Sequence, residues 1–166
     1  MKKTILYAYA LILLLALAAA SPSSAAKKAP QFPLTAECFS GLKDRGFACE
    51  YDGMPLDGLE VLRVNVFRPD SIGSVGFSLY FYREKSEVSI RLWNLREIRE
   101  KDAALETVCA INNAYRFYHF YWEEDGMISA KCDVPVRAGS AAEVCAELLS
   151  RGIDILEKTD RLTAGF

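Results

Sequence analysis

The stretch YRFYHFYWEEDGMISAKCDVP, residues 115–135, decides the fold of this chain. It contains two alternating runs joined at Asp125-Gly126, and Asp-Gly between such runs is the strongest short-range signal of a β-hairpin. A two-residue loop at Asp125 and Gly126 pairs His119 with Cys132. Directly paired residues point to the same side of a sheet. In this register one side of the hairpin is apolar and is predicted to face the core, and the other side carries Tyr118, Phe120 and Trp122.

A three-residue loop, Glu124 to Gly126, is the alternative for this hairpin. It moves Trp122 opposite Ile128, exchanges the faces of the two strands relative to one another, and removes His119 from the core side. The length of the loop therefore decides which aromatic residues face solvent.

Residues 1–26 have the layout of a secretory signal peptide. A basic start at Lys2 and Lys3 precedes an apolar run over residues 5–20, and small and polar residues follow. We expect cleavage after Ala26, with Ala20 as the second choice, and hence a protein that is exported to the periplasm or secreted. An uncleaved anchor is the alternative, although about 20 apolar residues are normally needed to span a membrane.

The remaining chain is mildly acidic. Lys2 and Lys3 are the only charged residues of the segment 1–26, so its removal changes the formal charge from −2 to −4. This charge gives no electrostatic reason to bind nucleic acid or anionic lipid, and we expect no nucleic-acid partner and no membrane contact beyond the export signal. Residues 27–33 form a short exposed lead-in, and residues 34–162 suffice for one domain with its own core.

Hydrophobic periodicity predicts the order helix, strands, helix, hairpin, helix. Apolar residues spaced four apart predict a first helix over residues 33–45. A helix cap at Asp102 predicts the start of a second helix, which runs to about residue 113. A capping box at Ser140 and Glu143 predicts the start of a third, which runs to about residue 158. Alternation predicts strands over residues 47–51, 59–68, 75–82 and 88–95, with a loop over residues 52–58. These elements define an α+β domain, with a mainly antiparallel sheet of about five to six strands, a helix at each end and one between.

The strands over residues 75–82 and 88–95 form a second hairpin. A two-residue loop at Lys85 and Ser86 pairs Phe81 with Ile90, which keeps the apolar residues together on one face. The opposite face of the sheet then gathers the candidate binding residues Tyr80, Tyr82, Arg91, Trp93, Tyr118, Phe120 and Trp122. Such residue types dominate interface hot spots, and the patch exceeds what a soluble monomer usually exposes. The alternatives are a helix that covers this face and self-association through it.

A family resemblance rests on residues 107–136. The run TVCAINNAY, an aromatic strand, the acidic turn EEDG, a second strand that ends DVPV, and a long closing helix resemble the YbjN-type domain. That family is described as sensory-transduction regulators, and its fold is similar to that of type III secretion chaperones. The resemblance covers about residues 34–158 in element order. It implies a chaperone-like fold and protein binding, and it supplies no catalytic residues. The signal peptide departs from the cytosolic setting of those chaperones.

Export would place the five cysteines in an oxidising compartment. The disulfide candidates are Cys132 with Cys145 and Cys38 with Cys49, because one turn between a strand and a helix separates the members of each pair. Cys109 is expected to stay free and buried. The alternative is that the cysteines act as small hydrophobic core residues. No two of them stand two to four residues apart, so their spacing predicts no metal site.

His119, the only histidine, lies beside Cys132 in the two-residue register. The pair could form a nucleophile and base or part of a metal site, but a catalytic thiol needs exposure and a lowered pKa, so core residues are the better interpretation. The chain also has no Gly-rich phosphate loop, nucleophile elbow or paired His motif. We therefore expect no enzymatic activity, no cofactor and no metal.

Together these features predict an exported, non-catalytic protein-interaction or regulatory module of the bacterial cell envelope. Its partner is an unknown protein or a second copy of the chain in a homodimer. The alternative function is a small-ligand-binding domain, with a pocket between the sheet and the C-terminal helix near His119 and Asn112.

Overall fold

The computed structural model describes residues 29–159. The predicted signal peptide (residues 1–26), the first two residues of the lead-in and residues 160–162 of the predicted domain lie outside the described residues. Across residues 29–159, no helix is long and apolar enough to cross a membrane.

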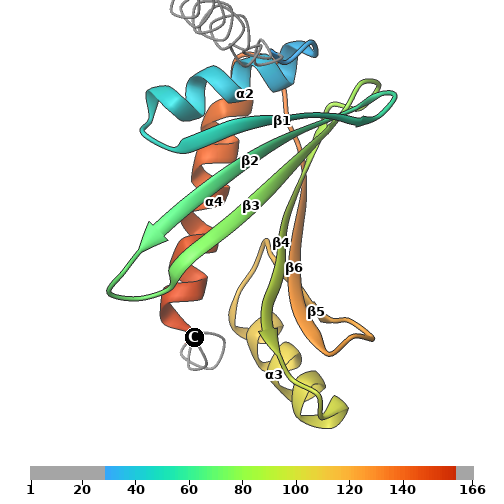
Figure 1. The fold of residues 1–166 in the computed structure, drawn as a ribbon, viewed down its shortest axis with the longest axis vertical. Helices are drawn as coiled ribbons and strands as arrows, with labels where there is room; N and C mark the ends of the chain where they lie inside the picture. The colour runs from blue at the N-terminus through green and yellow to red at the C-terminus, as the bar shows by residue number, and fades with distance from the viewer. Residues whose placement is uncertain (1–28, 160–166) are drawn as a thin grey trace, which may run out of the picture.

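Three helices and six strands make up the described part of the chain, in the predicted order (Figure 1). The helices are α2 (Pro33–Asp44), α3 (Lys101–Ala114) and α4 (Ala141–Lys158). The strands are β1 (Ala48–Leu56), β2 (Leu59–Arg68), β3 (Gly73–Tyr82), β4 (Glu87–Glu97), β5 (His119–Trp122) and β6 (Met127–Pro135). They form one antiparallel sheet in the order β1-β2-β3-β4-β6-β5. The α+β class and the antiparallel sheet are confirmed.

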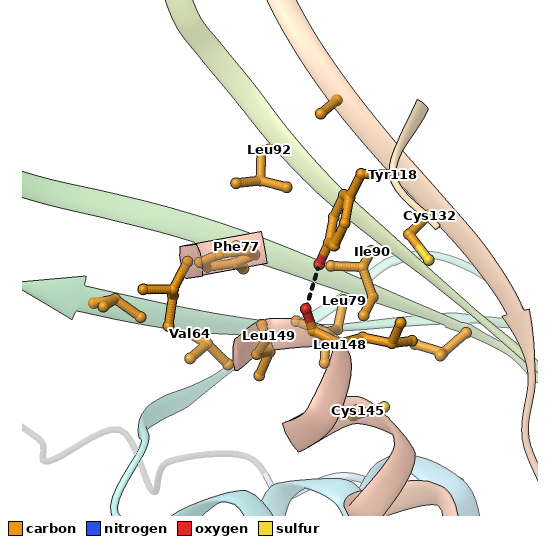
Figure 2. Packing of buried hydrophobic residues seen from close by; sticks show 14 of the residues in the cluster. Val64, Phe77, Leu79, Ile90, Leu92, Tyr118, Cys132, Cys145, Leu148 and Leu149 are labelled. Atoms are coloured by element: carbon orange, nitrogen blue, oxygen red, sulfur yellow. Dashed lines mark hydrogen bonds between the residues drawn. The ribbon is translucent and has the colours of Figure 1, made fainter. Parts of the chain in front are cut away.

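Helices α2 and α4 lie together against one face of the sheet, which we call the core face (Figure 1). Every second residue of the central strands points into this layer, as the pleat requires. The buried strand residues include Leu62, Val64, Phe77, Leu79, Ile90 and Leu92, each at most 1% exposed. They pack against Leu148 and Leu149 of α4 (Figure 2).

A glycine lets α4 approach the sheet closely. A Cβ at Gly152 would stand 2.9 Å from the Phe77 ring and 3.0 Å from the Tyr118 ring. The Tyr118 hydroxyl donates a hydrogen bond to the Leu148 carbonyl, at 3.1 Å (Figure 2). The glycine therefore serves helix-to-sheet packing.

A buried carboxylate fixes the start of α2 to the sheet. Glu60 of β2 is 0% exposed and accepts hydrogen bonds from the backbone amides of Gln31 and Phe32, at 2.7 and 3.0 Å, and from the Tyr51 hydroxyl, at 2.8 Å. Burial alone would raise the pKa of Glu60, but these hydrogen bonds outweigh it and lower the pKa below its usual range. Burial and the bond to Glu60 raise the pKa of Tyr51 to about 12, so its hydroxyl remains a donor.

Strand β1 continues through residues 52–56 of the segment 52–58, which we expected to be a loop, and only Asp57 and Gly58 form the turn to β2. It pairs with β2 as far as Leu56, with register shifts between Tyr51 and Gly53 and between Gly53 and Leu56. Gly53 has a φ of +109°, a conformation that favours glycine. The bulges absorb the turn-forming residues without ending the strand.

The β5–β6 hairpin has the three-residue loop, so the two-residue register was wrong. Trp122 pairs with Ile128, and the Glu123 amide donates to the Met127 carbonyl at 2.8 Å, which leaves Glu124 to Gly126 as the loop. Gly126 has a φ of +92°, as the left-handed position of such loops requires. The faces of β5 and β6 are therefore exchanged relative to one another.

Candidate protein-binding face

The face of the sheet opposite α2 and α4 is the candidate site, and we call it the outer face. Its residues alternate along each strand with those of the core face. One row of paired residues crosses it from β2 to β5, in the order Arg63, Ser78, Arg91, Lys131 and His119. Arg63 and His119 are exposed and the other three are half-buried. This row of the outer face is polar and at least partly accessible, whereas the core face is apolar and covered by helices.

Four of the seven predicted binding residues lie where the sequence placed them. Tyr80, Tyr82 and Arg91 alternate with buried neighbours and are half-buried on the outer face, and Trp93, where the β4–β6 register shifts between Leu92 and Arg96, is 46% exposed. Tyr80 is flanked in its row by Val61 and Ser89, both nearly fully buried. The outer face thus carries aromatic rings among charged side chains.

The other three predicted binding residues lie on the core side, which corrects the prediction. Tyr118 and Phe120 are 3% and 2% exposed, and Trp122 packs against the core and donates from its Nε1 to the Ile98 carbonyl at 2.9 Å. Phe120 pairs with Ala130 and Trp122 with Ile128, and both partners are fully buried. The physical reason is the one-residue register change, which turns β5 over.

Tyr121 is the residue that the two-residue register missed. It pairs with Ser129 and lies half-buried on the outer face. Burial and then Glu123 raise the pKa of Tyr121, whereas Arg91 lowers it, so the phenol stands within reach of both charges. The three-residue loop would have identified Tyr121, because it puts this residue on the side opposite Trp122.

Charged side chains on the outer face are paired with each other across neighbouring strands. The Arg91 guanidinium lies 3.5 Å from the Asp133 carboxylate, and the Ser89 hydroxyl donates to the same carboxylate. On β2, the Arg63 guanidinium lies 2.8 Å from Asp52. These pairs hold the long side chains in place across neighbouring strands, which lowers the entropy lost when a partner binds.

His119 and Cys132 lie on opposite faces of the sheet and cannot form a nucleophile pair. His119 is exposed on the outer face, whereas Cys132 is 4% exposed on the core face. Burial and then Asp133 raise the pKa of Cys132 to about 11, which is unfavourable for a nucleophilic thiol. Within residues 29–159, no three His, Cys, Asp or Glu residues group in a way that could hold a metal ion.

The cysteines are arranged differently from the predicted pairs. All five are free thiols, and Cys109 is exposed, which corrects its predicted burial. Cys145 contacts Cys38, with 3.7 Å between the sulfur atoms, so each predicted pair loses one member to this contact. The reason is that both helical cysteines point to the neighbouring helix.

The expected ligand pocket near His119 and Asn112 is filled by protein contacts. The Asn112 side chain is hydrogen-bonded to the Phe120 backbone, and His119 points away on the outer face. A cavity of about 270 Å³ lies nearby between the α3–β5 connection and the end of α4, lined in part by Phe117 and Arg151. The Arg151 guanidinium stacks over the Phe117 ring at 4.4 Å, so these two side chains already satisfy each other.

The fold and the site define a class: an α+β domain whose antiparallel sheet is covered by helices on one face and presents aromatic and charged residues on the other. The family model "YbjN: Putative bacterial sensory transduction regulator" matches residues 71–161, from just before β3 through α4. This match spans more than half of the 166 residues, and the chain belongs to the YbjN family. No curated protein matches the chain.

Proposed function

We propose that this protein is an exported, non-catalytic regulatory module of the cell envelope that binds another protein through the outer face. The regulatory role is supported by the description of the YbjN family. Export is supported by the basic, apolar and small-residue order of residues 1–26. The binding role is supported by the composition of the outer face.

The observation that carries the binding role is the aromatic cluster around Arg91. Tyr80, Trp93 and Tyr121 remain partly exposed on a face that α2 and α4 leave free. Tyrosine, tryptophan and arginine are the residue types on which interface energy concentrates, because their large rigid surfaces bury much area at little entropic cost. A partner that covers this cluster would remove the water from rings already held by the strands.

The absence of a catalytic role is supported by the position of the reactive side chains. The single histidine, His119, is exposed on the outer face and therefore lies away from the buried thiols. The Cys132 thiol also has a raised pKa. The outer face therefore offers contact surface and charge, and a regulatory protein needs no more than these.

The experiment compares the parent protein with a Tyr80→Ala/Trp93→Ala double variant. Both are used to capture proteins from a bacterial envelope fraction, with quantification by mass spectrometry. The parent should capture the partner, and the double variant should capture about tenfold less of it or lower still. The reason is that truncation of hot-spot residues costs at least about 1.4 kcal/mol of binding free energy.

A matched control is Leu105→Ala, which removes an apolar side chain that is 42% exposed on α3 and away from the outer face. It should retain the partner at the level of the parent. Equal capture by the parent and the double variant would contradict the proposal. Sedimentation of the parent and the double variant decides whether the partner is a second copy, since a dimer would then dissociate only in the double variant.

A further inference from the structure

Two thiols from distant parts of the chain meet between α2 and α4. Cys38 and Cys145 are both 0% exposed, they are 107 residues apart in sequence, and their sulfur atoms lie 3.7 Å apart. Figure 2 shows Cys145 on α4, apart from Cys132 on β6. The family match begins at residue 71, so this contact joins α2, which precedes the matched region, to the last helix of that region.

Contacts on both sides of Cys38 hold α2 against the start of α4. Directly before Cys38 in α2, Glu37 accepts hydrogen bonds from the backbone amides of Gly139 and Ala141, each at 2.8 Å, and so caps α4. Near the end of α2, Gly41 lies so close to Ala142 that a Cβ at this position would stand 2.5 Å from the Ala142 Cβ. The cysteines therefore meet because the surrounding backbone is fixed.

We propose that Cys38 and Cys145 form an intramolecular disulfide that ties α2 to α4 when the protein folds in an oxidising compartment. A disulfide S–S bond is about 2.0 Å long, so the sulfur atoms need to approach by less than about 2 Å. Rotation of the cysteine side chains can supply part of this movement, and the fixed helices need to supply little.

The bond forms by thiol–disulfide exchange with a disulfide oxidant such as oxidised glutathione. One protein thiolate attacks a sulfur of the oxidant, which forms a mixed disulfide and releases one small thiol. The second protein thiolate then attacks the protein sulfur of the mixed disulfide and releases the other small thiol. In total the two protein thiols lose two electrons and two protons, and the oxidant is reduced to two thiols.

The timing of oxidation follows from burial. The hydrogen bond with Cys145 and desolvation raise the pKa of Cys38 far above its usual range, and only the thiolate reacts. Both thiols are also 0% exposed, so an oxidant does not reach the pair in the folded protein, and the exchange takes place before α2 has closed over α4. After folding, the same burial protects the disulfide from reductants.

The other three cysteines lack such a partner position. Cys49 lies on the edge strand β1 and Cys132 on β6, which are separated in the sheet by β2, β3 and β4. Cys109 is exposed on α3. We expect Cys49 and Cys132 to remain buried thiols and Cys109 to remain the accessible one.

The test uses protein produced from the full chain, unfolded and reduced, and then refolded either with a mixture of reduced and oxidised glutathione or with dithiothreitol. After removal of the oxidant, the protein is unfolded in an alkylating agent, and disulfide-linked peptides are identified by mass spectrometry. The glutathione arm should give three free thiols and a peptide pair that links Cys38 to Cys145. The dithiothreitol arm should give five free thiols.

Two variants separate the proposed bond from other pairings. Cys109→Ala should keep the Cys38–Cys145 linkage and a urea midpoint that is higher in the oxidised than in the reduced protein, because a bridge that closes more than 100 residues restricts the unfolded chain. Cys145→Ala should lose both the linkage and the difference in midpoint.

Five free thiols in the oxidised parent would overturn the proposal. Linkage of Cys38 to Cys49, or of Cys132 to Cys145, would overturn it as well. The outer face and the export signal take no part in this test, so its failure would leave the proposed function standing.

Discussion

The side-chain amide of Asn112 pairs with the backbone of Phe120 in both directions. Its nitrogen donates to the Phe120 carbonyl and its oxygen accepts from the Phe120 amide, each at 2.8 Å. Phe120 belongs to β5, the last strand at one edge of the sheet. A side chain of α3 thus occupies backbone groups that would otherwise be open to pairing with another strand.

Asn112→Ala should destabilise the protein by about 1–3 kcal/mol, because it removes two hydrogen bonds at a half-buried edge. The amide proton of Phe120 should also exchange faster with solvent. Urea unfolding and residue-resolved hydrogen exchange measure the two effects. Asn113→Ala is the matched control, since Asn113 is exposed on the same helix, and it should change stability by less than about 0.5 kcal/mol. Unchanged exchange at Phe120 in Asn112→Ala would show that this pairing does not protect the edge.

Replacement of the two tryptophans should affect stability to different extents. Trp122→Phe removes the Nε1 hydrogen bond to the Ile98 carbonyl and should cost about 1–3 kcal/mol. Trp93→Phe, at a side chain that is 46% exposed, should cost less than about 0.5 kcal/mol. Urea unfolding measures both values.

Fluorescence provides an independent check on this pair, because the chain contains two tryptophans and each variant keeps one. The Trp122→Phe protein, which retains Trp93, should emit at longer wavelength and be quenched more strongly by acrylamide. The opposite order would mean that the two-residue hairpin register describes the protein in solution.

The two hairpins show why part of the candidate face could be predicted and part could not. In the β3–β4 hairpin, Phe81 pairs with Val88 and not with Ile90, and this offset of two residues leaves every side chain on its predicted face. In the β5–β6 hairpin the offset is one residue, which exchanges the faces. The sequence Glu-Glu-Asp-Gly is compatible with a two-residue and a three-residue loop, since both end in glycine.

Contacts between distant segments lay beyond the reach of local patterns. We predicted that Ser140 caps α4, but its side chain makes no such bond, and Glu37 of α2 caps the helix from 104 residues away in the chain. The meeting of Cys38 and Cys145 has the same origin. Periodicity identifies which face of each helix is apolar, but the partner of that face depends on how the helices pack on the sheet.

Gly152→Ala should destabilise the protein by about 1–3 kcal/mol, although alanine has the higher helix propensity by about 1 kcal/mol. The new methyl group would stand about 3 Å from the Phe77 and Tyr118 rings, so α4 or the rings would have to shift. The measurement is the urea midpoint of unfolding. Ser150→Ala, at an exposed position of α4, should be neutral or slightly stabilising. A gain of stability in Gly152→Ala would contradict the close packing of α4 on the sheet.

Glu60→Gln should destabilise the protein by about 1–3 kcal/mol at neutral pH. The carboxylate accepts hydrogen bonds from two backbone amides and one hydroxyl, and the new amide nitrogen, itself a donor, would face one or more of these donors. The pKa of Glu60 is lowered by folding, so its contribution is complete above the pKa of the unfolded chain, about 4.3, and is lost as the pH falls through the folded value. The stability gap between parent and variant should therefore be constant from about pH 7 to pH 6 and shrink below about pH 4.

Urea unfolding across this pH range measures the gap in unfolding free energy. Glu50→Gln, at an exposed site on β1, is the control and should change stability by less than about 0.5 kcal/mol. A gap that stays constant into acid would mean that folding does not lower the pKa of Glu60.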